Sequence, residues 1–197
     1  MQLILANFEQ ADARQAMKRL TEGQVARLEG IRSEKARGQF MWSRVIYNGL
    51  IRRITGAMPT FELEPGRPHP SFKHQGTRYW TTLSHTGAWV AVALDTAPLA
   101  IDLETMKPRQ WQALSEFTFS DQACRWIEES PSPLESFYVI WGQRECEIKM
   151  QSFEKTPRLF RATKITTQPT DLMLTCLCDP QSTWKPQILP ITLLENF

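Results

Sequence analysis

The chain has 197 residues, of which 42% are hydrophobic and 22% are charged, and it carries seven Trp and ten Phe. That length holds one ordinary domain or two small ones that share a core, and the composition excludes a disordered chain. The net charge of +2 gives no reason to expect a nucleic-acid partner, and no run reaches the roughly 20 apolar residues of a membrane span, so we expect a cytoplasmic protein.

Helices are expected to dominate the first part of the chain. The sequence predicts a short strand over residues 3–6, a helix over 11–20, and a longer helix over 34–54 that a Gly and a Pro stop. A segment punctuated by Pro and Gly follows, and strands are expected over 79–84 and 89–94.

The second part of the chain has a similar content of strands and helices. The sequence predicts a strand over 99–104, a helix N-cap within 118–121 and a helix over 133–150, followed by strands over 172–178 and 187–193. We therefore predict an α+β protein built from two similar halves.

The cysteines are expected to be reduced and buried. Four cysteines at irregular spacing make a poor disulfide framework, and no His stands at zinc-ligand spacing from them. Cys176 and Cys178 would share one face of their predicted strand.

Asp102 and Glu104 stand inside an apolar segment that reads as a strand. Residues two apart on a strand share a face, so the two carboxylates point the same way, opposite Ile101 and Leu103. Two such charges repel each other unless a cation joins them.

Glu145 and Lys149 lie in the predicted helix over 133–150. Glu145 falls on an expected inward stripe, and Lys149 lies one turn beyond it. Three carboxylates that converge with an ammonium suit Mg²⁺ and a phosphate held by it, which indicates metal-assisted phosphoryl chemistry. The other members of the expected stripe are Leu134, Tyr138, Trp141 and Ile148.

Basic residues crowd the stretch before Gly56. Arg37 and Arg44 are seven residues apart, which places them on one helical face, where they could bind a phosphate or an acidic protein. The other basic residues of this stretch include Arg27, Arg32, Lys35, Arg52 and Arg53.

These residues stand in an ordered series of short motifs. Arg37 and Arg44 are followed by Gly-Arg-Pro at 66–68, Ser-His-Thr at 84–86, Ala-Ile-Asp-Leu-Glu at 100–104, and Trp-Gly-Gln-Arg-Glu running on to Lys at 141–149. In this order and spacing the chain resembles the surfactin-type 4′-phosphopantetheinyl transferases, most of all the short bacterial holo-acyl-carrier-protein synthases.

The resemblance implies a fold and a reaction. The fold would be two similar α/β subdomains with pseudo-twofold symmetry, residues 1–98 and 99–197, with the active site in the cleft between them. The enzyme would move the 4′-phosphopantetheine arm of coenzyme A to a serine of an apo acyl or peptidyl carrier protein. It would release adenosine 3′,5′-bisphosphate and act as a monomer, without a nucleic-acid or membrane partner.

The resemblance also implies a role for each matched residue. Asp102, Glu104 and Glu145 match the family's metal-binding carboxylates, and Mg²⁺ is the implied ion. Glu145 is further expected to take the serine proton, and Lys149 to neutralise the diphosphate and the leaving group. The residues expected to contact coenzyme A phosphates are Ser84, His85, Arg37, Arg44 and Arg67.

Two other classes of protein stay open. A coenzyme A- or carrier-binding protein without turnover would keep the basic face but misplace the metal ligands. An Mg²⁺-dependent phosphoesterase would hydrolyse its substrate without any carrier. The chain departs from the family pattern with Ala100 for Gly, Thr82 for Asn, and Arg67 and Arg144 for Lys, which removes neither a metal ligand nor the base.

Overall fold

A computed structural model describes residues 1–57, 71–108, 110–151, 153 and 158–190. Its helices are α1 (Ala13–Met17), α2 (Glu22–Glu29), α3 (Glu34–Thr55), α4 (Trp111–Thr118), α5 (Asp121–Glu128) and α6 (Pro133–Met150). Its strands are β1 (Gln2–Asn7), β2 (Ser71–His74), β3 (Thr77–Thr86), β4 (Trp89–Asp95), β5 (Ala100–Thr105), β6 (Leu159–Ile165), β7 (Leu172–Cys178) and β8 (Gln187–Leu189). The mixed α+β class is confirmed.

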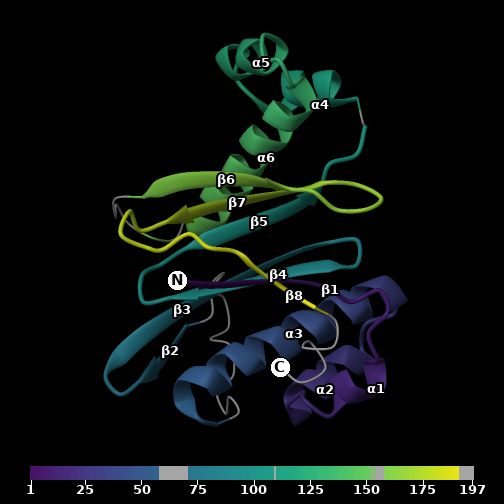
Figure 1. The fold of residues 1–197 in the computed structure, drawn as a ribbon, viewed down its shortest axis with the longest axis vertical. Coiled ribbons are helices and arrows are strands. Elements are labelled where there is room, and N and C mark those ends of the chain that lie inside the picture. Colours follow the sequence, from purple (N-terminus) through teal and green to yellow (C-terminus); the bar gives the residue numbers. More distant parts are fainter. Residues whose placement is uncertain (58–70, 109, 152, 154–157, 191–197) are drawn as a thin grey trace.

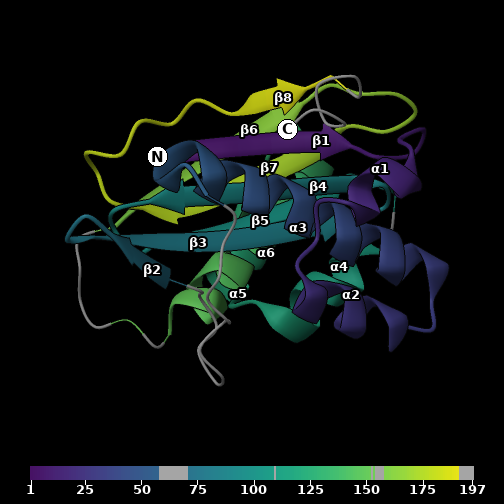
Figure 2. The ribbon, with the colours of Figure 1, turned by 90° about the horizontal axis from the view of Figure 1, so that it is seen from below.

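The described strands form two sheets, which lie one above the other in Figure 1. The first has the order β2-β3-β4-β1-β8, and the second has the order β5-β7-β6. The strand that follows Pro98 opens the second sheet, whereas β8, near the C-terminus, returns to pair in parallel with β1. Figure 2 shows β8 beside β1 at the edge of the first sheet.

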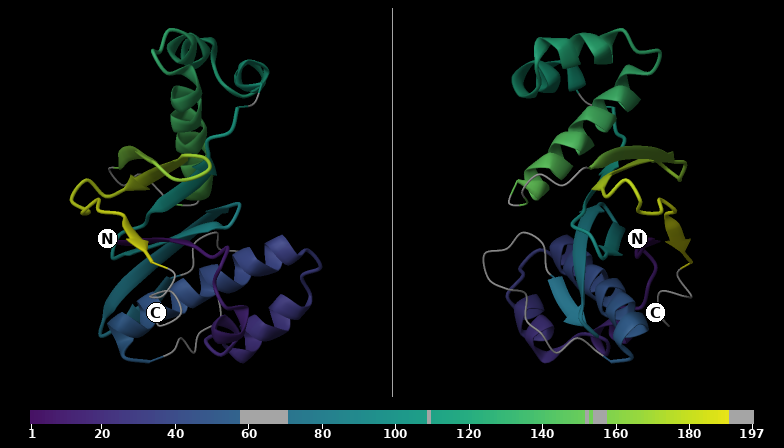
Figure 3. Two further views of the ribbon diagram at one scale, coloured as in Figure 1. Left: turned by 45° about the vertical axis from the view of Figure 1, so that its right-hand side comes forward. Right: turned by 90° about the vertical axis from the view of Figure 1, so that its left-hand side faces the viewer.

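Helix α3 covers the outer face of the first sheet, with α1 and α2 beside it (Figures 1 and 3). Ser33 caps its start by accepting the N–H of Ala36, and Gly56 ends it in the left-handed conformation that glycine adopts most easily. Its buried face, including Trp42, packs on alternate residues of β1 and β4, since a strand turns every second side chain to the same side.

A second core fills the space between the sheets. The inward side chains of β1 and β4 meet those of the second sheet there, so each of these two strands contributes one face to each core. The buried residues of this cluster are Leu3, Leu5, Ala91, Ala93, Leu99, Ile101, Leu103, Leu172, Leu174, Cys176 and Cys178. Cys176 and Cys178 therefore share a face, as expected. Cys146 is also buried, Cys124 is half-buried, and all four cysteines are free.

Helix α6 lies against the outer face of the second sheet and carries α4 and α5 at its far end (Figure 3). It approaches β7 so closely that a Cβ on Gly142 would lie 2.3 Å from the hydroxyl oxygen of Thr175. Its buried stripe runs along Tyr138, Gly142, Cys146 and Met150. The expected inward position of Ile148 is wrong, because this side chain is 45% exposed. Glu145 flanks the buried stripe and is half-buried.

Four described elements lie outside the sequence prediction: α2, α4, β2 and β6. The expected helix over 11–20 is also limited to the short α1. The expected strand over 187–193 is described only as far as Pro190. In the described part of the chain no helix is both long and apolar enough to cross a membrane.

Candidate active site

The two sheets are joined along β3 and β5 by side-chain hydroxyls. The Ser84 hydroxyl oxygen accepts the backbone N–H of Leu103 at 3.1 Å, and the Thr86 hydroxyl oxygen accepts that of Thr105 at 3.2 Å. The Thr86 and Thr105 hydroxyls are themselves 2.9 Å apart. Because alternate residues of each strand repeat the same bond, the Ser-His-Thr motif holds β3 against the strand that carries the carboxylates.

Asp102 lies at the centre of a buried polar network where β3 meets β5, a seam between the two sheets, and it is only 6% exposed. Its Oδ1 accepts a hydrogen bond from the Ser84 hydroxyl at 3.1 Å and another from Lys149 Nζ at 2.9 Å. Lys149 Nζ also donates to the carbonyl oxygen of Ile101 at 2.8 Å. A buried carboxylate needs such partners, since an unpaired charge in the interior is strongly destabilising.

The other oxygen of Asp102, Oδ2, is buried and has no hydrogen-bond partner among the described residues. Buried polar atoms are normally satisfied, so an orphaned carboxylate oxygen fits a ligand for a cation. Glu104 lies two residues along the same strand, and Glu145 lies one turn before Lys149 on α6.

The predicted convergence of the three carboxylates is not seen in this structure. Among the described residues, no three His, Cys, Asp or Glu side chains form a group that could hold a metal ion. Asp102 fits a cation by its orphaned oxygen, whereas Glu104 and Glu145 do not complete a cluster with it. The metal assignment therefore stays a prediction.

His85 lies on the opposite face of β3 from Ser84, and its side chain is exposed. Its surroundings are positively charged. Partial desolvation lowers the pKa of His85, and the charges of Lys149, Lys35 and Arg44 lower it further. The ring is therefore neutral at pH 7, and cations from both α3 and α6 gather around it.

Arg44 and Arg27 both contact the ring of Phe40, an arrangement that the sequence did not reveal. The guanidinium carbon of Arg44 lies 4.8 Å from the centre of the Phe40 ring, and that of Arg27 lies 5.5 Å from the same ring. Burial, and then the charge of Arg27, lower the pKa of Arg44. Within the described ranges, no carboxylate forms an ion pair with Arg44. Arg27 and Arg44 thus hold a concentration of positive charge suited to an anion.

Arg37 and Arg67 are not part of this arrangement as the structure describes it. Arg37 lines a pocket of about 360 Å³ among the first three helices, together with Met17, Leu28 and Met41. Arg67 lies outside the described residues.

The described geometry can bind and activate a phosphate compound. The positive charges of Lys149 on α6 and of Lys35 and Arg44 on α3 act on His85 and lower its pKa, and a bound diphosphate would neutralise these charges. Next to this charge stands the buried carboxylate of Asp102, which Ser84 and Lys149 hold in a fixed orientation. Anion binding and carboxylate chemistry are therefore available at one seam.

Comparison with known proteins identifies similar sequences. A candidate 4′-phosphopantetheinyl transferase of Haemophilus influenzae is 34% identical over 95 residues, which cover 46% of this chain and 39% of that protein. The 4′-phosphopantetheinyl transferase AcpT of Salmonella typhi is 31% identical over 107 residues, covering 52% of this chain and 54% of the relative. The 4′-phosphopantetheinyl transferase Sfp of Bacillus subtilis is 32% identical over 73 residues, covering 35% and 31%. No family model matches the chain.

The matched regions thus span between 31% and 54% of the length of these relatives. All are named as 4′-phosphopantetheinyl transferases, the enzymes that the ordered motifs of this chain resemble. The motifs and these partial similarities make the chain similar to the 4′-phosphopantetheinyl transferases and support its membership of that superfamily.

Proposed function

We propose that this protein transfers the 4′-phosphopantetheine arm of coenzyme A to a serine of an apo acyl or peptidyl carrier protein. The observation that carries the proposal is the Ser84–Asp102–Lys149 network beside His85 and the cations of α3. It provides a phosphate site and an oriented carboxylate in one place. The names of the similar proteins support the same reaction.

The fold supports a cleft between two related halves. Each sheet carries one long helix on its outer face, α3 on the first and α6 on the second, and the cations around His85 come from both helices. We infer a pseudo-twofold relation of the halves and a coenzyme A site between them, with Arg37, Arg44, Arg67, Ser84, His85 and Lys149 along the substrate.

Asp102, Glu104 and Glu145 are the residues that would hold Mg²⁺. When bound, the ion would offset the negative charge of the diphosphate as its bond breaks. Asp102 is already held by Ser84 and Lys149, and its Oδ2 is left for the ion. Lys149 would remain beside the leaving phosphate, because its ammonium already lies at this carboxylate.

Glu145 would act as the general base, either directly or through a water. It takes the proton of the carrier serine while the serine oxygen forms a bond to the phosphorus next to the arm. The bond from that phosphorus to the bridging oxygen breaks, and adenosine 3′,5′-bisphosphate leaves with the bond's electron pair. Atoms and charges balance without any further reactant.

The test is mass spectrometry of a panel of apo carrier proteins incubated with this protein, coenzyme A and Mg²⁺, with EDTA as control. We expect a gain of roughly 340 Da on a carrier serine, lost with EDTA, since the arm carries one phosphate and EDTA would remove the Mg²⁺ that the proposed reaction uses. Hydrolysis of coenzyme A without a carrier would instead establish the phosphoesterase. Binding of coenzyme A with no gain on any carrier would favour a binding protein.

A further inference from the structure

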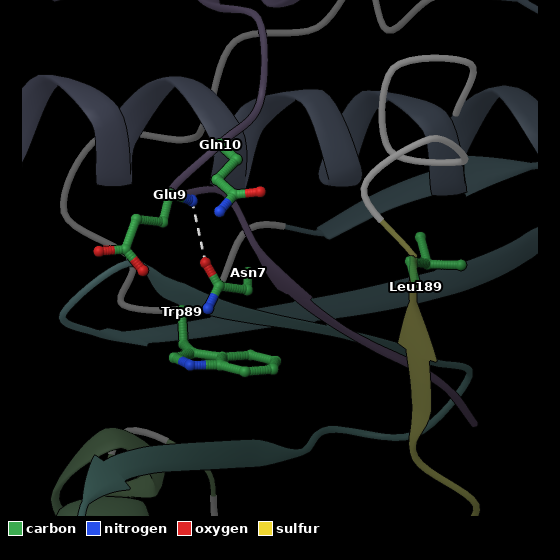
Figure 4. A pocket seen from close by; sticks show the side chains of 5 residues that line it. All are labelled: Asn7, Glu9, Gln10, Trp89 and Leu189. Atoms are coloured by element: carbon green, nitrogen blue, oxygen red, sulfur yellow. Dashed lines mark hydrogen bonds between the residues drawn. The ribbon is translucent and has the colours of Figure 1, made fainter. Parts of the chain in front are cut away.

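A pocket of about 300 Å³ opens where β1 ends and β4 begins, and the reaction proposed above makes no use of it. Asn7, Glu9, Gln10, Trp89 and Leu189 line it, and Figure 4 shows the first three side chains above the indole ring of Trp89. We infer that this pocket receives the amide-containing arm of coenzyme A, which rests on the proposed function.

The polar groups of the pocket are free to bind a ligand. Asn7 Oδ1 accepts the backbone N–H of Glu9 at 2.9 Å, which leaves the Asn7 amide nitrogen as a donor. Within the described part of the chain, the side chains of Glu9 and Gln10 make no hydrogen bond or ion pair. The pocket therefore offers amide donors, an amide oxygen and a carboxylate beside one another.

The pantetheine arm has the matching chemistry. Its two amides and its hydroxyl group donate and accept hydrogen bonds, and an amide side chain such as Gln10 can both donate to and accept from these groups. Its methyl-bearing carbon and methylene groups are apolar and can lie on the half-buried ring of Trp89. A pocket of mixed character suits this arm better than it suits a purely apolar or purely ionic ligand.

Charge separates this pocket from the phosphate site. Glu9 places a negative charge at the pocket, which repels a phosphate, whereas the arm beyond the phosphates is neutral. The cations around His85 have the opposite preference. Coenzyme A would therefore lie with its phosphates at the cations and its arm in the pocket.

The pocket lies within reach of the phosphate site. Trp89 pairs with Thr86 on one side and with Asn7 on the other, and Thr86 directly follows His85. Neighbouring strands are about 4.8 Å apart, so Asn7 is roughly 10 Å from the strand that carries His85. The extended arm is roughly 15 Å long, given ordinary covalent bond lengths. Trp89 and Asn7 lie on the face of the first sheet opposite to His85, so an arm anchored at its phosphate near His85 would pass around the end of β3 to enter the pocket.

Isothermal titration calorimetry of the full chain with coenzyme A and with adenosine 3′,5′-bisphosphate tests the inference, because the second ligand lacks the arm. Trp89→Ala should weaken coenzyme A binding about tenfold and leave adenosine 3′,5′-bisphosphate binding unchanged. Trp89 also packs on the core between the sheets, so the exposed Gln10→Ala provides a second variant. It should weaken coenzyme A binding about threefold, whereas the exposed control Gln15→Ala should have no effect.

The outcomes separate the inference from the proposed function. Unchanged coenzyme A affinity in Gln10→Ala and in folded Trp89→Ala would overturn the pocket assignment while the wild-type protein still transfers the arm. An equal loss for both ligands would overturn it as well, since the bisphosphate cannot enter an arm pocket. If the wild-type protein binds no coenzyme A, the proposed function fails and the inference fails with it.

Discussion

The two long helices carry their positive charge in different ways. On α3, Lys35 and Arg44 have no carboxylate partner among the described residues. On α6, Lys149 is paired with the buried Asp102 at 2.9 Å. An unpaired cation keeps its full attraction for an incoming anion, whereas a paired buried cation is also part of the structure. The first half therefore offers binding charge, and the second offers an ordered network for chemistry.

The largest expected effect tests whether α6 carries the chemistry. Glu145→Gln should reduce the transfer rate by roughly 10² to 10⁴, because an amide cannot take the serine proton. Coenzyme A affinity, measured by calorimetry without Mg²⁺, should stay the same, because the loss of a proposed ligand of the ion then has no effect. The matched control is Glu147→Gln on the exposed side of the same helix, which should keep the wild-type rate. If the transfer rate of Glu145→Gln lies within twofold of the wild-type rate, Glu145 is not the general base.

The second test compares a buried ion pair with an exposed one. Lys149→Met should lower the free energy of unfolding by about 3 kcal/mol, because it leaves Asp102 buried without its cation. Lys164→Met removes a cation from the exposed pairs with Glu135 and Asp171 and should change stability little. Urea denaturation measures both. Equal effects of the two substitutions would contradict the structural role of Lys149.

The third test asks whether α3 supplies binding charge. Arg44→Ala should weaken the binding of both coenzyme A and adenosine 3′,5′-bisphosphate by roughly tenfold, the cost of losing a charge-assisted phosphate contact. The transfer rate at saturating coenzyme A should change little. Arg52→Ala, an exposed position near the end of the same helix, is the control and should leave affinity unchanged. A lower saturated rate with normal affinity would assign Arg44 to the chemistry instead.

The smallest expected effect is a pH dependence centred on His85. Its pKa is lowered in the folded protein, so the unfolded chain binds the proton more readily and stability falls as the pH drops below the ordinary His range. A bound phosphate favours the protonated ring. Coenzyme A should therefore bind a few-fold more tightly at pH 5.5 than at pH 8, and His85→Gln should abolish that difference. Calorimetry at both pH values decides the matter, and a dependence that persists in His85→Gln would assign it to another group.

Local signals were sufficient for the long elements. The Gly and Pro stop signals predicted the end of α3 to within one residue, and Pro133 marked the start of α6. The short elements were not predicted, because the local sequence signals for them are weak. In α2, Gly23 lowers helix propensity, although the capping box between Thr21 and Gln24 was a usable start signal. Among the described strands, β6 pairs with β7 alone, so its place at the edge of the second sheet depends on this tertiary pairing more than on its own sequence.

The sequence by itself determined which chemical groups are present at the site and, for some of them, the face of the strand on which the side chain lies. Strand alternation places Asp102 with Glu104 and separates Ser84 from His85, because the side-chain period of a strand is two. The tertiary structure decided which groups meet. In the folded chain, Lys149 and Ser84 donate hydrogen bonds to Asp102. Arg27 and Arg44 contact the same Phe40 ring, and Ile148 is exposed to solvent. Such contacts join elements far apart in the chain, and their geometry follows from how helices and sheets pack rather than from any local pattern.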